Sequence, residues 1–278
     1  MFSSSGLDYV PHPPQITIIP DTIKSKYDEV YFEGVELETT QFYERVKNDK
    51  YFEPSIEIIS KESVAKFIET AINNKYERFL FLVNSNDIVD YMPVVTEALK
   101  KYPDIDSKVV KIGALSFPLA HLALECDKIF RATDSLDNVM SYINNFKNSF
   151  KILFYSPKEN ILPSVKRIDF DEDVISAAIQ GKLFVYDGES IQEIRKNLQE
   201  SYLEKMFDLF TEHTIGSKVV PFIVYTNRHS LYNDVLERKL ISIYPRLKSL
   251  KKYPIPAILG NKMGPNTIGI GFIKKVDE

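Results

Sequence analysis

Apolar residues follow two alternating patterns along the chain, short continuous runs and spacings of three and four residues. The runs suit strands buried on both faces, and the spaced segments have the period of amphipathic helices. The runs predict strands at residues 16–20, 79–83, 109–112, 151–155, 183–186 and 219–226. The spaced segments predict helices at residues 39–47, 60–72, 91–102, 118–130, 135–146, 171–181, 190–212 and 231–242. Strands that alternate with helices predict an α/β fold with a largely parallel sheet.

The order of strand and helix restarts near residue 150, which predicts two α/β domains. We expect an N-terminal domain with a parallel sheet at residues 1–150 and a C-terminal domain at residues 151–278. A polar stretch at residues 156–160 supports this boundary. Residues 50–62 are expected to reach the cleft between the domains.

Glycines gather in the last part of the chain. Four of the ten lie between Gly260 and Gly271, after an apolar lead-in and within an alternating run of isoleucine and glycine. Glycine is used where the backbone takes positive φ or approaches another group closely. Residues 255–272 therefore predict a strand, a tight loop and a closely packed strand. The pattern leaves open whether the loop binds a ligand or is a structural turn.

Composition excludes several classes of protein. The chain has 278 residues, 44% of them hydrophobic, and a net charge of −4, so it can bury a large core and lacks the basic surface typical of nucleic-acid binding. The single cysteine, Cys126, excludes an internal disulfide framework and a cysteine-rich zinc site. No apolar run approaches membrane-spanning length, and the first residues do not resemble a signal peptide. We expect a cytoplasmic protein.

Residues suited to catalysis are not gathered in any known motif. The four histidines, His12, His121, His213 and His229, are scattered and have no second ligand at metal-site spacing. The acidic run at residues 171–173 fits the first turn of a helix, where the macrodipole favours carboxylates. We therefore expect no enzymatic activity, no cofactor and no metal ion.

The glycine segment and several other stretches resemble the DegV family of bacterial fatty-acid-binding proteins. The family pattern Ile-Gly-Pro-Val-Ile-Gly-x-His-Thr-Gly-Pro-Gly-x-x-Gly aligns without a gap with residues 255–269, Ile-Pro-Ala-Ile-Leu-Gly-Asn-Lys-Met-Gly-Pro-Asn-Thr-Ile-Gly. Residues 16–20 and 31–43 are similar to the family's early segment, which ends in Phe-Tyr. Residues 4–8 are similar to the motif that follows the family's first strand, so that strand is almost missing here.

The resemblance implies a two-domain DegV-like fold, in which each domain is a sheet with packed helices and a ligand tunnel lies between the domains. In the family an acyl chain lies in an apolar cavity, where burial is favourable by about 0.8 kcal/mol per CH₂. Hydroxyls and an imidazole hold its carboxylate, since a buried charge needs donors. Such proteins present a fatty acid to a separate ATP-binding kinase subunit. The implied partners are a fatty acid or related lipid and a fatty acid kinase subunit.

The carboxylate-binding positions of the family are changed in this chain. The family's threonine is Ile56, and its serine neighbour is Glu57. The second hydroxyl falls on Ile88 or Val89, and the histidine is Lys262. In one interpretation the Lys262 ammonium replaces the imidazole and pairs with an anionic head group. In the others Lys262 points to solvent, or it pairs with Glu57 and closes the site.

These positions and their neighbours define the expected ligand site. The candidate ligand-binding residues are Ile56, Glu57, Ser60, Ser85, Ile88, Asn261, Lys262, Met263 and Gly264. The leading hypothesis is a non-enzymatic carrier of a long-chain fatty acid whose head group lies near Lys262. The alternative is a diverged family member that has lost fatty acid binding and acts as an interaction or regulatory protein.

Overall fold

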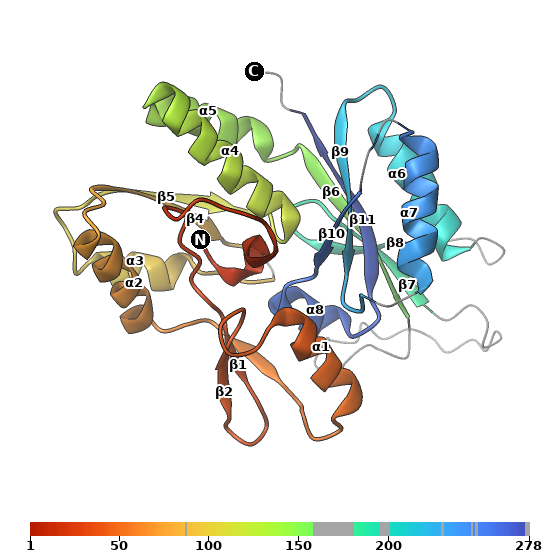
Figure 1. Ribbon diagram of the computed structural model, residues 1–278, viewed down its shortest axis with the longest axis horizontal. Helices are drawn as coiled ribbons and strands as arrows, with labels where there is room; N and C mark the ends of the chain where they lie inside the picture. Colours follow the sequence, from red (N-terminus) through yellow and green to blue (C-terminus); the bar gives the residue numbers. More distant parts are fainter. Residues whose placement is uncertain are drawn as a thin grey trace.

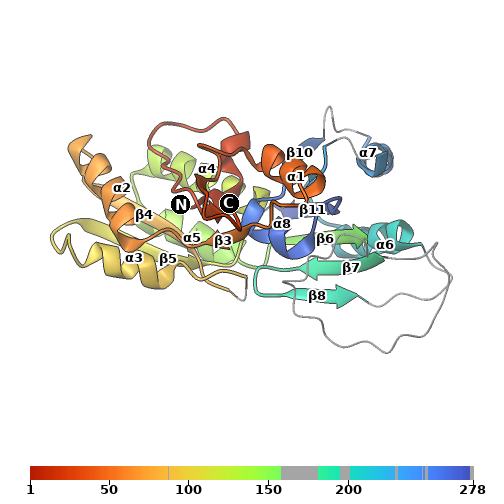
Figure 2. The same cartoon turned by 90° about the horizontal axis from the view of Figure 1, so that it is seen from below.

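The computed structural model is a mixed α/β molecule in which helices pack on three separate sheets within the described residues. It describes residues 1–86, 88–157, 181–194, 201–228, 231–245, 247 and 250–275. The first and second halves of the chain lie side by side, and helix α8 (Ala257–Met263) lies between them (Figures 1 and 2).

The first half contains two small sheets. Strands β2 (Val30–Phe32), β1 (Thr22–Lys24) and β3 (Ser55–Glu57) form an antiparallel sheet in that order. Strands β4 (Arg78–Asn84) and β5 (Asp106–Ile112) form a parallel pair. The helical elements are η1 (Ser3–Ser5), η2 (Leu7–Tyr9), α1 (Thr39–Asn48), α2 (Lys61–Asn73), α3 (Met92–Leu99), α4 (Phe117–Thr133) and α5 (Leu136–Phe146).

The second half is built on a six-stranded sheet in the order β10-β9-β11-β6-β7-β8. Its strands are β6 (Phe150–Pro157), β7 (Gly181–Tyr186), β8 (Ile191–Ile194), β9 (Val219–Tyr225), β10 (Lys251–Pro254) and β11 (Ile268–Lys274). Only β10 and β9 run parallel, and the other neighbouring strands are antiparallel. Helices α6 (Tyr202–Thr214) and α7 (Leu231–Ile243) contact this sheet.

Most of the predicted helices begin within a few residues of the expected position. In two of them a serine side chain caps the first turn. The hydroxyl of Ser60 accepts a hydrogen bond from the Ser63 N–H at 3.2 Å, and that of Ser135 accepts one from the Asn138 N–H at 3.3 Å. Each cap satisfies a backbone donor that the first turn of a helix leaves free.

The prediction of a parallel sheet in the first half fits the pair β4 and β5 but not the antiparallel sheet β2-β1-β3. In the described part of the second half a single strand pair is parallel, so a largely parallel sheet is wrong there. The predicted strand at residues 16–20 is also wrong, because only Ile19 forms a bridge there, with Phe2. Pro14 and Pro20 flank this segment and have no N–H to donate. The predicted helix at 171–181 lies outside the described residues, apart from Gly181, which begins β7. Residues 158–160 of the polar stretch also lie outside them.

Two further elements differ from the prediction. The helix expected at 190–212 begins only at Tyr202, because Ile191–Ile194 pairs with β7 across the Asp187-Gly188 turn. The strand expected at the start of the glycine segment is helix α8. The close packing expected after it is confirmed, since a Cβ on Gly271 would lie 2.2 Å from the Phe222 ring.

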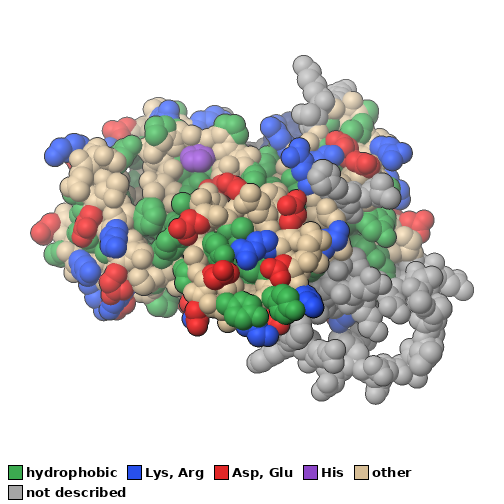
Figure 3. All heavy atoms as spheres, turned by 60° about the horizontal axis from the view of Figure 1, so that its bottom comes forward, with side chains coloured by type: hydrophobic (Ala, Val, Ile, Leu, Met, Phe, Trp, Pro, Cys, Tyr) green, Lys and Arg blue, Asp and Glu red, His purple; other side chains and the backbone are tan. Residues whose placement is uncertain are grey.

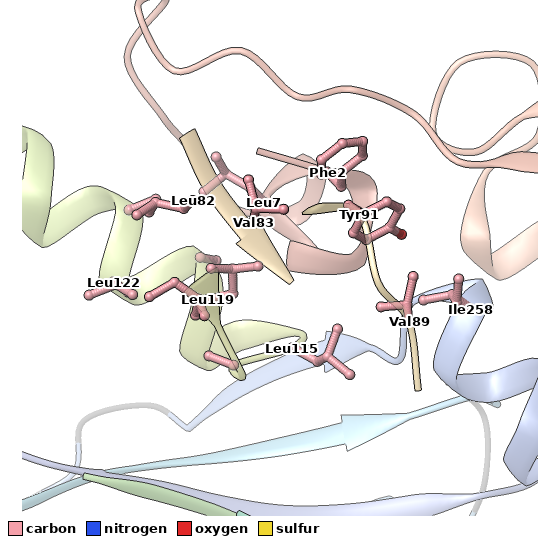
Figure 4. Packing of buried hydrophobic residues seen from close by; sticks show 14 of the residues in the cluster. Phe2, Leu7, Leu82, Val83, Val89, Tyr91, Leu115, Leu119, Leu122 and Ile258 are labelled. Carbon is pink, nitrogen blue, oxygen red and sulfur yellow. The ribbon is translucent and has the colours of Figure 1, made fainter. Parts of the chain in front are cut away.

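One hydrophobic core joins the two halves. In the first half of the chain, Leu82 and Val83 of β4 lie close to Leu119 and Leu122 of α4 (Figure 4). The same cluster continues into β9, β10 and α8 of the second half. At one point the two backbones touch, because a Cβ on Gly113 would lie 1.8 Å from the Gly188 carbonyl oxygen. The halves are therefore packed directly against each other.

Candidate ligand-binding pocket

A pocket of about 400 Å³ opens between the two halves of the chain. It is lined by Ile56, Ile58, Asn86, Ile88, Val89, Asp90, Ile258, Asn261 and Lys262. The last three belong to α8, and the others come from β3 and the loops that follow β3 and β4. Small-molecule sites have volumes of roughly 300–1,000 Å³, so the pocket is large enough for a ligand. Five of the nine side chains are isoleucine or valine and the other four are polar or charged, so polar and apolar groups contribute about equally to its wall.

Asn86 shapes the wall that follows β4. Its side-chain oxygen accepts hydrogen bonds from the backbone N–H groups of Ile88 at 2.9 Å and Val89 at 3.1 Å, and so closes a tight turn. Its amide nitrogen donates to Tyr186 Oη in the second half at 2.9 Å. Asn86 therefore fixes the backbone of Ile88 and Val89, which both line the pocket, and it connects their loop to strand β7.

Lys262 supplies the positive charge at the pocket. Its Nζ donates a hydrogen bond to the Ile88 carbonyl oxygen at 2.7 Å, so the ammonium is held over the loop after β4. The side chain is exposed, which places the charge at the rim rather than in the interior. An ammonium group combines three donors with a positive charge, which are the properties that an anionic ligand requires.

Asn261 brings a second polar group to the same pocket. Its Nδ2 lies 3.5 Å from the Pro54 carbonyl oxygen, and its Oδ1 is buried without a hydrogen-bond partner among the described residues. A buried amide oxygen without a partner costs free energy, and a ligand donor or a turned amide would relieve that cost. Asn261 and Lys262 are thus the polar groups that α8 contributes to the pocket, and Asn86 and Asp90 contribute others from the loop after β4.

Other predicted residues lie near the pocket without lining it. Glu57 is exposed on β3, paired with Thr22, and among the described ion pairs none joins it to Lys262. Ser60 caps α2. Ser85 forms a bridge with Asp90 beyond the end of β4. The pocket thus brings together Ile56, Ile88, Asn261 and Lys262 of the predicted set.

Met263 and Gly264 act through the backbone at the end of α8. The Met263 carbonyl accepts hydrogen bonds from Ser156 Oγ at 2.7 Å and from Thr267 Oγ1 at 3.0 Å. Gly264 takes φ 84° and ψ 164°, a region open essentially to glycine alone. The two residues therefore fix the end of the helix that carries Asn261 and Lys262.

Aromatic side chains pack across the interface between the two halves. Phe117 of α4 stacks on Tyr253 of β10 with ring centroids 4.3 Å apart, and it meets the edge of Phe222 at 5.1 Å. All three are buried. These rings close the interface between the two halves at this point.

A buried acidic cluster, which the sequence analysis did not predict, contacts the first residue of α8. Glu33 accepts hydrogen bonds from the Ala257 N–H at 2.7 Å, from Thr39 Oγ1 at 2.8 Å and from Ser3 Oγ at 3.0 Å. Asp21 accepts from the Ser3 and Tyr91 hydroxyls. Burial raises the pKa of Glu33 and raises that of Asp21 to about 8, with the neighbouring carboxylate adding to the shift at Asp21. The sequence feature that could have indicated this cluster is the carboxylate of Glu33 in the turn Tyr-Phe-Glu-Gly.

The described side chains offer no arrangement for covalent or acid–base chemistry in the pocket. Burial raises the pKa of the Cys126 thiol to about 12 and lowers that of His121, and neither residue lines the pocket. No group of three metal-ligating side chains occurs in the part of the chain that the structure describes, while His229 and residues 171–173 lie outside it. On the face in Figure 3, acidic and basic side chains are interspersed. The pocket, with both apolar and polar lining residues, suits binding of an amphipathic molecule.

Comparison with known proteins gives a consistent match. The family model of DegV, described as a family of uncharacterised proteins, matches residues 12–275. The curated proteins contain no match. Among the described helices, none is long and apolar enough to cross a membrane.

Solved structures of DegV proteins share the fold over nearly the whole chain. A DegV lipid-binding protein from Thermotoga maritima is 17% identical, with a TM-score of 0.75 and coverage of 100% of this chain and 98% of that one. The fatty acid-binding protein DegV from Bacillus subtilis is 17% identical, with a TM-score of 0.74 and coverage of 99% and 97%. The fatty acid kinase B3 protein from Streptococcus pneumoniae, loaded with linoleic acid, is 14% identical, with a TM-score of 0.70 and coverage of 99% and 98%.

Proposed function

The chain belongs to the DegV family, and from that premise we propose that it is a non-enzymatic carrier of a long-chain fatty acid. The acyl chain enters the pocket between the two halves, residues 1–150 and residues 151–278, which act as the two domains. Its carboxylate lies against Lys262 and Asn261. The observation that carries the proposal is a charged amine at the rim of a pocket of about 400 Å³ that isoleucine and valine side chains line in part.

The head group is held by different chemistry from that expected of the family. The hydroxyl positions are Ile56 and either Ile88 or Val89, and all three residues line the pocket as apolar walls. One ammonium supplies the charge that a carboxylate requires when hydroxyl donors are absent. Ser60 and Ser85 are not needed as donors, since neither lines the pocket.

The carrier passes its ligand to a separate kinase subunit in the cytoplasm. The similar protein from Streptococcus pneumoniae has a name that ties it to a fatty acid kinase. An exposed Lys262 leaves the carboxylate within reach of a second protein at the rim of the pocket. The ATP site belongs to that partner, and this chain has no nucleic-acid or cofactor role.

Titration with ¹³C-carboxyl-labelled oleate tests the proposal. The expected result is one saturable site per chain, with a carboxylate resonance that moves away from its position in free oleate. Ile258→Glu puts a carboxylate into the pocket wall and should abolish this signal, whereas Leu136→Glu, on a half-exposed position of α5, should not. A resonance that is unchanged at saturating protein would refute fatty acid binding.

A second function is favoured by one observation, the buried packing of Phe117 on Tyr253 across the interface between the two halves. If that interface stays closed, a long acyl chain cannot enter between the halves, and the protein acts as an interaction or regulatory partner of the kinase subunit. A series of saturated acids distinguishes the two functions. Affinity should rise about fourfold per CH₂ while carbons enter an apolar site; a rise that stops at short chains favours the second function.

A further inference from the structure

Two buried carboxyl groups, those of Asp21 and Glu33, share one serine hydroxyl in the first half of the chain. Ser3 Oγ lies 3.1 Å from Asp21 Oδ2 and 3.0 Å from Glu33 Oε2, and it accepts a hydrogen bond from the Asp21 N–H at 2.9 Å. A hydroxyl has one proton to donate, so it can donate to only one of the two carboxyl groups. The other contact is a hydrogen bond only if that carboxyl group carries a proton of its own.

The remaining contacts assign this proton to Asp21. Glu33 accepts further hydrogen bonds from Thr39 Oγ1 at 2.8 Å and from the Ala257 N–H at 2.7 Å, and several donors stabilise a carboxylate. Asp21 accepts from the Tyr91 hydroxyl at Oδ2, while its Oδ1 is buried without a hydrogen-bond partner among the described residues. A negative charge on that oxygen would be costly. Asp21 is therefore the neutral group, and its proton lies on Oδ2 against the serine hydroxyl.

These contacts reach two walls of the ligand-binding pocket. Tyr91, which contacts the neutral carboxyl group, directly follows the pocket residue Asp90 in the loop after β4. Ala257, which contacts the charged one, directly precedes the pocket residue Ile258 in α8. The two walls also meet directly, at the hydrogen bond from Lys262 to a carbonyl of the loop. The pair of carboxyl groups is thus a second connection between the same two walls.

The titratable groups that face this pair are acidic or phenolic. Tyr91 of the loop after β4 faces Asp21. Asp8 of η2 and Tyr43 of α1 face Glu33. Among the described ion pairs none includes either carboxyl group. A second negative charge in this pair would therefore lie beside the first in a buried site, where repulsion between like charges is strong.

We propose that Asp21 is a positioning residue whose buried proton keeps the two walls of the pocket together, so that ligand binding depends on pH. The proposal rests on the proposed function, since it concerns the same pocket. With the proton present, Ser3 bonds to both carboxyl groups. Without it, two negative charges lie on either side of one hydroxyl, and their repulsion separates the loop after β4 from α8.

The pH at which the proton is lost follows from the surroundings of Asp21. Burial, with the neighbouring Glu33 carboxylate, raises the pKa of Asp21 to about 8. The folded protein therefore keeps the proton at pH 7 and loses it as the pH rises through 8. Ligand affinity should be highest below this pKa and should fall above it.

Oleate affinity measured between pH 7 and pH 9 tests the proposal. A protein that must regain a proton before it binds loses about tenfold in affinity one pH unit above a pKa of about 8. Oleyl alcohol, which has no carboxylate, should show the same loss, because the proton acts on the pocket walls rather than on the head group. Asp21→Asn, which is neutral at every pH, should match wild type at pH 7 and lose no affinity at pH 9. Asp104→Asn, at an exposed position, should keep the wild-type profile.

A second variant tests the geometry and does not require Asp21→Asn to be stable. Tyr91→Phe keeps the ring that stacks on Phe2 with centroids 3.8 Å apart (Figure 4). It removes the hydroxyl whose hydrogen bond favours the ionised form of Asp21. The pKa of Asp21 should rise further, so the midpoint of the pH profile should move to higher pH. A midpoint equal to that of wild type would contradict the assignment of the proton to Asp21.

Ligand-free protein separates this proposal from fatty acid binding itself. Its infrared spectrum at pH 7 should contain the C=O band of a buried protonated carboxyl group, which Asp21→Asn lacks and wild type loses by pH 9. Amide exchange at Tyr91 and Ala257, corrected for its intrinsic pH dependence, should accelerate over the same range in wild type and not in Asp21→Asn.

Failure of oleate to bind at any pH would refute the proposed function, and the ligand-free measurements would still decide whether the proton holds the two walls together. Absence of the infrared band or unchanged amide exchange would overturn the proposal. Equal pH profiles of wild type and Asp21→Asn, or a pH effect on oleate that oleyl alcohol does not share, would overturn it as well.

Discussion

Lys262→Met removes the positive charge that lines the pocket within the described part of the chain, while it keeps a side chain of similar length. A charge-assisted hydrogen bond contributes about 1.5–3 kcal/mol, whereas an ion pair open to solvent contributes about 0–1 kcal/mol. Lys262 lies between these limits, because its side chain is exposed and its Nζ is fixed on the Ile88 carbonyl at 2.7 Å. We therefore expect a loss of about 1–2 kcal/mol, which is a 5- to 30-fold weaker affinity for oleate.

The assay compares oleate with oleyl alcohol by competition against a fluorescent fatty acid. Wild type should prefer the acid, and Lys262→Met should lose that preference while its affinity for the alcohol stays the same. Lys262→Arg should keep most of the preference, and Lys100→Met, an exposed lysine in an i,i+3 pair with Glu97, is the matched control. An unchanged preference in Lys262→Met would refute the assigned role of the ammonium.

Three other perturbations test the structure around the pocket. Gly264→Ala should destabilise the protein by about 1–3 kcal/mol, because φ 84° and ψ 164° are strained for any residue with a Cβ; an unchanged urea midpoint would contradict this. Asn86→Ala removes the acceptor of two backbone N–H groups and the contact with Tyr186, so about 1–3 kcal/mol of unfolding free energy should be lost, together with oleate affinity; full stability would show that the turn holds without it. Burial raises the pKa of Asp21 from 3.8 to about 8, so between these pH values the folded state keeps a proton that the unfolded state has released, and stability should fall as pH rises. Asp21→Asn should flatten that fall in urea unfolding between pH 5 and 8, and an equally steep profile would argue against Asp21 as its source.

The sequence predicted local elements where the pattern and the caps agreed. Ser60 and Ser135 begin helices as expected, because a hydroxyl before an apolar repeat is sufficient to start one. Residues 190–194 misled the prediction, since the Asp-Gly turn and pairing with β7 outweigh helix propensity. Pairing across a sheet depends on segments distant in the chain, which periodicity does not report.

The pocket was predictable only in part for the same reason. The resemblance placed Ile56, Ile88 and Lys262 together, and the structure brings all three to one pocket. Asn86 and Ile258 were missed, because a turn-forming asparagine and a single helical isoleucine look ordinary in sequence. The buried Asp21 and Glu33 were also missed, since carboxylates are mostly exposed and only the fold shows the donors that surround them.

The central claim is that this chain carries a fatty acid, and its most direct test is mass spectrometry of lipid extracted from protein purified without added ligand. The account predicts a long-chain fatty acid in near-stoichiometric amount from wild type and a clearly reduced amount from Ile258→Glu purified in parallel. Wild-type protein that yields no fatty acid, and takes up none on incubation with oleate, would contradict it.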